Sequence, residues 1–419
     1  MRGVIAIALL VPAVLTAADS PLAIRNAVVE TMASTGRIEG ATAVIRDGKF
    51  AAIGKEVAVP PDATVIDAAG GTLMPGIIDP YFEFAITGAT TDSGPRTVVV
   101  GGRQITLPGG GGRTGSGYSR VADSFYAYDA GFKPLPRTGL TRLGVVTNGM
   151  GQAAIVRVTP KDPQRMMDQP DGFAFVSVTN SSESLDQVRQ RLSFAARGGK
   201  EAAGGSRPDG FGASATQGAK LWADVVAGNV ALFAECANSA AVLHLLKAIE
   251  PYRNVKLVLF LGGDSIAETV TAIKDRKATV IVRPGLELLP NTRDRFNPAR
   301  LLYENGVEVA FTLTGRPPQA GGGGGAGRGL GGEETPSVRT IDSEFPLFPV
   351  AIVVKTGMPR IAALESLTKK PALILGIEKT HGSIEPGKAA DVLLYSGDPL
   401  DPASRLLRTI VDGRVVHAN

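Results

Sequence analysis

A regular alternation of short apolar runs and helical segments in the second half of the chain most constrains its fold. Each run is almost continuously apolar, as in strands that are covered on both faces. Asn238 precedes the first intervening helical segment and predicts an N-cap, because its side chain can accept a hydrogen bond from a free N–H. Strands spaced in this way predict a parallel sheet with helices packed on it. The runs span residues 230–233, 255–260, 278–282 and 307–313.

Two hairpin patterns lie at opposite ends of the chain. Asp47-Gly48 separates two strand-like runs near the start, and Asp412-Gly413 separates two more near the end. An Asp-Gly pair between such runs indicates a type I′ turn, because both central residues of that turn need positive φ. We therefore predict one small β domain that is built from both termini and encloses a long insert.

The length of the chain fits this arrangement. Its 419 residues allow a large core and two domains. We predict an α/β fold in which residues 75–382 form a (β/α)₈ TIM-like barrel, which takes about 250 residues. Residues 19–74 and 383–419 would form a small composite β-sandwich. Two glycine-rich tracts, near 109–117 and 317–332, interrupt the barrel. They are interpreted either as a lid over a site or as disordered insertions, which their composition favours on entropy.

The first 18 residues predict an export signal. Arg2 gives a positive start, residues 4–15 are apolar, and Thr16-Ala17-Ala18 offers small residues for cleavage. The apolar run is too short for a comfortable transmembrane span. A buried N-terminal helix is the other interpretation. We expect a periplasmic or secreted protein with no membrane span after signal removal.

Composition excludes some classes of function. The net charge is only +4, and no block of Lys or Arg stands out, so we expect no nucleic-acid partner. Cys236 is the only cysteine, which excludes an internal disulfide. The chain has three histidines, at positions 244, 381 and 417.

Two motifs, one at each junction between the β domain and the insert, carry a resemblance to a known family. Residues 73–84 read Leu-Met-Pro-Gly-Ile-Ile-Asp-Pro-Tyr-Phe-Glu-Phe, and residues 382–393 read Gly-Ser-Ile-Glu-Pro-Gly-Lys-Ala-Ala-Asp-Val-Leu. The first is similar to the start of the barrel in the amidohydrolase superfamily, and the second to the return of the chain into its β-sandwich. With residues 396–402 the likeness is closest to the imidazolonepropionase-like branch.

The resemblance implies hydrolysis of non-peptide C–N bonds by water that one or two divalent metals, usually zinc, activate. The first two histidine ligands of the family fall on Tyr81 and Glu83, its fifth-strand histidine on Phe233, and its final aspartate on Thr314. The sixth-strand histidine falls near Leu261. The expected ligands are missing from all of these positions, and the family needs about four imidazoles where this chain has three. We therefore expect no metal cofactor.

Three carboxylates keep a second interpretation open. Glu83, Glu235 and Asp264 are each predicted at or near the carboxyl end of a strand, and so at one mouth of the barrel. Their oxygens could hold a hard cation such as calcium or magnesium. Solvated rim charges or ion pairs with arginines are the alternative. Tyr81 is a candidate acid or hydrogen-bond donor beside them, or a packing residue.

Three hypotheses for function follow. The leading one is a catalytically degenerate amidohydrolase-fold protein that acts as a binding or partner subunit, in a homo-oligomer or with an active relative. The second is an active hydrolase of C–N bonds whose catalytic residues are drawn from Glu83, Glu235, Asp264 and Tyr81. The third is a protein that binds a small-molecule ligand in the pocket that is the active site in the family, beneath the glycine-rich tracts.

Overall fold

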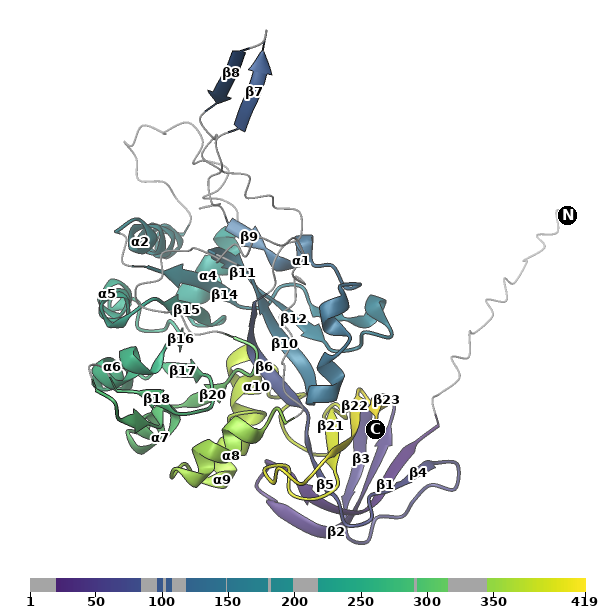
Figure 1. Cartoon of the computed structure of the whole chain (residues 1–419). Helices are drawn as coiled ribbons and strands as arrows, with labels where there is room; N and C mark the ends of the chain where they lie inside the picture. The colour runs from purple at the N-terminus through teal and green to yellow at the C-terminus, as the bar shows by residue number, and fades with distance from the viewer. Residues whose placement is uncertain are drawn as a thin grey trace, which may run out of the picture.

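The computed structural model describes most of the chain as a strand-and-helix body above a β-sheet (Figure 1). The predicted signal and the two glycine-rich tracts lie outside the described residues. No helix within the described segments has both the length and the apolar character needed to cross a bilayer. The described residues are 20–83, 118–147, 149–179, 182–198, 218–289, 292–315 and 345–419, with the backbone alone of 96–100 and 103–107.

The terminal sheet combines the first and last strands of the chain in the order β23-β22-β21-β5-β1-β2-β3, with β4 paired to β1. The two ends of the chain meet where β5 pairs antiparallel with β21. A separate apolar cluster, which includes Ile24, Phe50 and Val392, lies within this sheet. Its strands are β1 (Leu22–Glu30), β2 (Arg37–Arg46), β3 (Lys49–Gly54), β4 (Thr64–Asp67), β5 (Thr72–Pro75), β21 (Val392–Tyr395), β22 (Leu406–Val411) and β23 (Arg414–Ala418).

Both predicted hairpins are present in the terminal sheet. Asp47 and Gly48 have φ of 51° and 74°, Asp412 and Gly413 have φ of 47° and 74°, and the pairs join β2 to β3 and β22 to β23. The two turns also touch, because a Cβ added at Gly48 would lie 2.9 Å from the carbonyl oxygen of Asp412. Gly48 is thus required by its backbone conformation and by this approach. The sheet folds back on itself until its end hairpins meet.

The strands that form successive positions of the barrel wall, called staves below, follow the order of the chain. β6 pairs parallel with β10, and β14, β15, β16, β17 and β20 pair parallel in series. This confirms the parallel sheet that was predicted for the second half. The staves are β6 (Ile77–Glu83), β10 (Leu140–Val146), β11 (Met150–Gln152) with β12 (Ala154–Arg157), β14 (Ala174–Val178), β15 (Leu232–Cys236), β16 (Leu257–Phe260), β17 (Thr279–Val282) and β20 (Val309–Phe311).

The third stave departs from the parallel pattern. β12 pairs antiparallel with β10, and β11 pairs antiparallel with β14. Ala153 joins the two halves of this stave, and its N–H donates to the Phe173 carbonyl at 2.9 Å. Only residues 147–149 separate β10 from β11, and a parallel return needs a crossover of about a dozen residues or more. The strand therefore has to run antiparallel.

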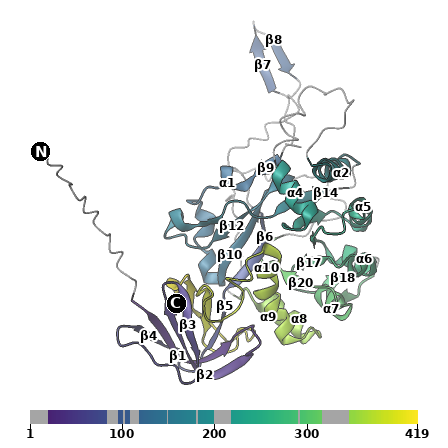
Figure 2. The same ribbon diagram turned by 180° about the vertical axis from the view of Figure 1, so that it is seen from behind.

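The ring closes between β20 and β6. The Thr312 hydroxyl donates to the Tyr81 carbonyl at 3.2 Å. The segment between α9 (Arg360–Glu365) and α10 (Lys369–Leu375) bonds both strands, because Ile78 N–H donates to Leu367 O at 2.9 Å and Phe311 N–H to Ser366 O at 2.7 Å. Figures 1 and 2 place α5, α6 and α7 on the outside of the staves.

The predicted cap at Asn238 is confirmed, because its side chain accepts from Ala241 N–H at the start of α5. Asn297 caps α7 in the same way, and that helix begins at Pro298. The major helices are α2 (Ser182–Ala196), α4 (Ala219–Ala227), α5 (Ser239–Ile249), α6 (Gly263–Arg276), α7 (Pro298–Glu304), α8 (Phe348–Lys355), α9 (Arg360–Glu365) and α10 (Lys369–Leu375). Smaller elements are β7 (Arg96–Val100), β8 (Arg103–Leu107), β9 (Tyr118–Arg120), α1 (Val121–Ser124), η1 (Ala130–Phe132), η2 (Leu135–Thr138), η3 (Pro163–Arg165), β13 (Met167–Gln169), β18 (Glu287–Leu288) and β19 (Arg295–Phe296).

Candidate functional site

The mouth of the barrel, at the carboxyl ends of its strands, holds a tyrosine–glutamate pair. Tyr81 on β6 is 6% exposed, and its hydroxyl donates to Glu235 Oε2 on β15 at 2.8 Å. Its ring packs on Phe260 of β16 with the ring centroids 4.4 Å apart. The structure thus brings together two of the predicted candidates and adds Phe260, which the sequence analysis missed.

Burial sets the protonation of this pair. It raises the pKa of Tyr81 well above its ordinary value, and the charge of Glu235 adds to the shift. Burial also raises the pKa of Glu235, opposed by the Tyr81 hydrogen bond and assisted by the charge of half-buried Glu83. Tyr81 is therefore a neutral donor to Glu235, and Glu83 lies close enough to act on both groups.

Phe233 fills the barrel beneath the mouth. It lies on β15, is 1% exposed, and stacks on Phe173 with the ring centroids 3.8 Å apart. Phe173 immediately precedes β14, so two adjacent strands supply the pair. An aromatic pair of this kind is stabilised by apolar burial and by its ring contact. It offers no donor atom for a cation.

Thr314, the fourth predicted position, is engaged by a buried acid. Asp79 Oδ2 accepts from Leu313 N–H at 2.9 Å, from Thr314 N–H at 3.0 Å and from the Thr314 hydroxyl at 2.8 Å. Its Oδ1 accepts from Tyr81 N–H at 3.1 Å. Burial raises the pKa of Asp79, while these hydrogen bonds oppose the shift. The sequence analysis missed this role, although an acid inside an apolar strand must find donors when it is buried.

Asp264, the third predicted carboxylate, hydrogen-bonds locally at the start of a helix. It sits in the first turn of α6, where its Oδ1 accepts from Ser265 N–H at 2.8 Å. Its charge acts on Glu287, which accepts from Gly263 N–H. Among the side chains that the structure describes, Glu83, Glu235 and Asp264 do not come together as metal ligands do. The predicted cluster of three is therefore not formed as a set of metal ligands among the described residues.

Three of the four residues at the predicted ligand positions do not fit a zinc ion. Zinc in proteins takes nitrogen, sulfur or carboxylate ligands at about 2.0–2.3 Å. Phe233 has no such atom, the Thr314 hydroxyl donates to Asp79, and the Tyr81 hydroxyl donates to Glu235.

A second polar cluster lies at the base of the barrel, where it meets the terminal sheet. His381, Asp391 and Asp412 have potential ligand atoms within 4.8 Å of one another, and they form the one such group among the described residues. A guanidinium already fills the space between them. Arg142 is 1% exposed, and its nitrogens lie 3.1 Å from His381 Nε2, 3.4 Å from Asp391 Oδ2 and 2.6 Å from Asp412 Oδ1.

This base cluster joins segments that are distant in the chain. Arg157 on β12 contacts Asp412 at 2.6 Å and Asp168 at 2.7 Å. Arg165 lies 3.5 Å from Asp412, which therefore pairs with three arginines. Burial, assisted by Arg142, lowers the pKa of His381 to about 3. Neutral His381 can therefore accept from Arg142 Nε while its Nδ1 faces the Thr380 hydroxyl. Burial raises the pKa of Asp391 to about 6, opposed by Arg142.

Comparison with known proteins agrees with the architecture. Residues 354–417 match the family model described as "Amidohydrolase family". A crystal structure of an amidohydrolase from Thermotoga maritima MSB8 superposes with a TM-score of 0.67 at 18% identity, over 95% of this chain and all of that one. No curated protein matches the chain.

Other solved structures share the fold at lower similarity. A Xaa-Pro dipeptidase with bound methionine gives a TM-score of 0.53 at 16% identity, covering 96% of this chain and 100% of that one. A dihydropyrimidinase from Brevibacillus agri NCHU1002 gives 0.51 at 14%, covering 95% of each chain. The fold is that of the amidohydrolase barrels. The C-terminal segment of the chain, residues 354–417, also carries the sequence pattern of the amidohydrolase family.

Proposed function

We propose that this chain is a non-hydrolytic protein of the amidohydrolase superfamily that acts by binding, as a binding or partner subunit. One observation carries the proposal. Three of the four side chains at the positions that the resemblance assigns firmly to metal ligands are engaged with neighbours inside the protein: Tyr81 with Glu235, Phe233 with Phe173, and Thr314 with Asp79.

The chemistry of the mouth supports a loss of hydrolysis. A metal-dependent hydrolase needs a cation that lowers the pKa of a bound water toward neutrality. A cation bound beside Phe233 would lose coordinated water on that side, and the phenyl ring offers no donor atom to replace it. Freeing Thr314 or Tyr81 would also cost the hydrogen bond that each makes to a buried carboxylate.

A turnover assay tests the proposal. Dipeptides, Xaa-Pro dipeptides and a dihydropyrimidine represent the substrates that the names of the structural relatives indicate. With added zinc or magnesium, we expect no turnover above the uncatalysed rate for any substrate, with wild type or with Glu235→Gln. Turnover that Glu235→Gln abolishes and the exposed control Glu250→Gln retains would overturn the proposal. That result would favour the alternative, a C–N hydrolase using Glu83 and Glu235.

We also propose that the chain is exported. The support is the sequence pattern of residues 1–18 alone. N-terminal sequencing of the protein recovered from the periplasm or the medium tests it, with a start near Ala18 or Asp19 expected. An intact Met1 on cytoplasmic protein would contradict it.

A further inference from the structure

A large groove lies at the base of the barrel, on the side away from Tyr81 and Glu235. It has a volume of about 1300 Å³ and is lined by β21, β22 and β23 of the terminal sheet, by η2, and by the segment that leads into α8. η2 runs into the amino end of β10, so the groove is at the opposite end of the strands from the mouth. Pockets for small molecules are commonly about 300–1,000 Å³, so the groove has room for one.

The charged side chains of the groove are mostly cationic. Lys133, Arg137, Lys161 and Arg405 line it, against one acidic side chain, Asp401. All four cations are exposed. Within the described part of the chain none of the four takes part in a salt bridge, unlike Arg142 and Arg157 in the base cluster. Cations that lack a partner inside the protein are suited to an anionic ligand.

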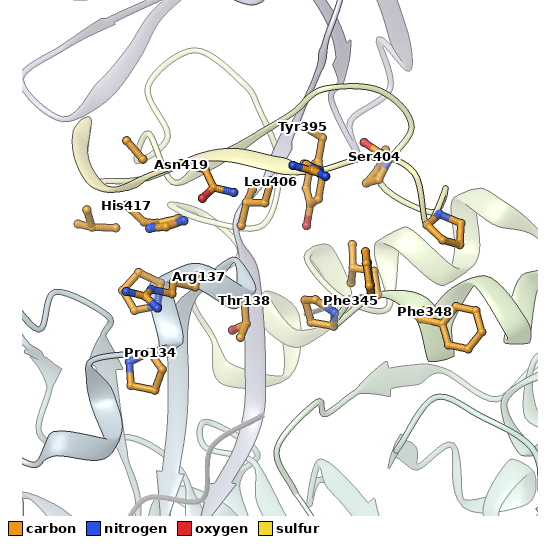
Figure 3. A pocket seen from close by; sticks show the side chains of 18 of the residues that line it. Pro134, Arg137, Thr138, Phe345, Phe348, Tyr395, Ser404, Leu406, His417 and Asn419 are labelled. Atoms are coloured by element: carbon orange, nitrogen blue, oxygen red, sulfur yellow. The ribbon is translucent and has the colours of Figure 1, made fainter. Parts of the chain in front are cut away.

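A buried hydroxyl points into the same groove. Tyr395 on β21 is 5% exposed, and its Oη has no hydrogen-bond partner among the described residues. Figure 3 shows this hydroxyl directed into the space between Leu406 and Phe345. A buried polar group without a hydrogen bond is unusual and costs folding free energy. The hydroxyl is therefore suited to donate to an acceptor on a bound ligand. This observation is independent of the surface charge.

Apolar side chains form the rest of the wall. Phe345 and Phe348 are 46% and 51% exposed, and both line the groove with Leu406. Figure 3 places Phe345 across the groove from Tyr395, and Arg137 and His417 further along it. An apolar body and an anionic group would therefore find separate partners.

We propose that this groove binds a small organic anion. Its apolar body lies between Phe345 and Leu406, an oxygen acceptor faces the Tyr395 hydroxyl, and its carboxylate or phosphate group lies toward Arg137 and Lys161. The site is separate from the barrel mouth. The inference gives the proposed binding function a ligand class, and it does not depend on the absence of hydrolysis.

His417 supplies a reporter for the experiment. It lies on β23 in the groove, and burial, assisted by the charges of Arg137 and Lys161, lowers its pKa. Since the chain has three histidines, its imidazole signals can be assigned by substitution. An anion bound beside Arg137 and Lys161 offsets their charges and raises the pKa of His417.

The test uses 4-acetylbenzoate and 4-acetylphenyl phosphate, which join an aromatic body and a ketone oxygen to the two kinds of anionic group. Titration by calorimetry and by the His417 resonance should give saturable binding by at least one. Arg137→Gln/Lys161→Gln should weaken it about tenfold or more, because the substitutions remove both cations that face the anionic group. Neutral acetophenone should bind at least tenfold more weakly, since it lacks the charge.

Two further variants separate a built site from general attraction. Lys247→Gln/Lys274→Gln removes the same charge from exposed positions on α5 and α6 and should leave the affinity unchanged. Tyr395→Phe should weaken binding several-fold without lowering the melting temperature, because it deletes a hydroxyl that has no internal partner.

Binding of neither probe, or equal weakening by both double variants, would overturn the proposal. Unchanged affinity in Tyr395→Phe would remove the hydroxyl from the site and contradict the proposed pose. The turnover assay reads the barrel mouth, so its outcome is independent of this one. A chain without hydrolysis and without anion binding would refute only the groove.

Discussion

The two ends of the barrel use polar side chains differently. At the mouth, Tyr81, Glu235 and Asp79 hydrogen-bond within a layer of aromatic rings, and no arginine or lysine pairs with them among the described contacts. At the base, Arg142 and Arg157 bridge several acids from the barrel and from the terminal sheet. The polar groups at the mouth are thus packed as in a protein core, whereas those at the base link the barrel to the terminal sheet through ion pairs.

The difference teaches which contacts the scaffold requires. The Gly-Lys-Ala-Ala-Asp stretch of the C-terminal motif contributes Asp391 to the base cluster, and the last hairpin contributes Asp412. The motif near the start of the barrel contributes Asp79 to the wall of the mouth. The motif residues Asp79 and Asp391 thus make structural contacts. Of the positions that the resemblance assigns to metal ligands, Tyr81, Phe233 and Thr314 are engaged with neighbours inside the protein.

The largest expected effect lies at the base. Arg142→Met should lower the free energy of unfolding by about 3–5 kcal/mol, because it leaves Asp391 and Asp412 buried with fewer cations. Urea denaturation measures it. Arg189→Met is the control, since its ion pair with Asp186 is about half exposed and worth less than about 1 kcal/mol. Equal stability of the two variants would show that the base cluster does not stabilise the contact between the barrel and the terminal sheet.

At the mouth, Asp79→Asn should cost about 2–3 kcal/mol. The new amide has one acceptor oxygen, so it cannot satisfy all the N–H groups of Tyr81, Leu313 and Thr314. Urea denaturation beside exposed Asp275→Asn measures the difference. A wild-type midpoint for Asp79→Asn would mean that these bonds contribute no stability.

Glu235→Gln should stabilise the protein at pH 8 by about 1 kcal/mol, because it removes a charge from a buried position and keeps an acceptor for Tyr81. The folded pKa of Glu235 is raised, so its charge costs stability above that pKa. The cost fades as the pH falls through the folded pKa toward the unfolded value of about 4.3. Melting temperatures at pH 8 and pH 4, with Glu250→Gln as control, test the sign. A loss of stability at pH 8 would contradict it.

The smallest expected effect concerns Asp264. Asp264→Asn should change stability by less than about 0.5 kcal/mol, since the residue hydrogen-bonds within its own helical turn. The double variant Glu235→Gln/Asp264→Asn should be additive, because the two groups share no partner. A coupling energy above about 1 kcal/mol would show that Asp264 interacts with the residues of the mouth.

Local patterns in the sequence predicted much of the fold. The Asp-Gly turns, the Asn238 cap and the apolar strands after residue 230 are local signals, and the structure contains each of them. The antiparallel third stave was missed because its direction follows from the short 147–149 loop, which is evident only once both strand ends are known. α8 was missed because its apolar, β-branched sequence lacks helical periodicity.

The candidate site was predictable only in part. The positions of Tyr81, Phe233 and Thr314 came from the resemblance, but their partners came from the structure. Asp79 and Thr314 are 235 residues apart, and Arg142 and Asp412 are 270 apart. A single sequence carries no signal for contacts at such separations. The orphaned Tyr395 hydroxyl likewise depends on how the terminal sheet meets the barrel.

Zinc binding by the purified full chain, prepared without a histidine tag, tests the central claim most directly. After equilibrium dialysis against micromolar zinc, elemental analysis should give far less than one ion per chain, unchanged by Glu83→Gln or Glu235→Gln. One or two zinc ions per chain that either variant removes would contradict it, and the barrel mouth would then hold a metal site.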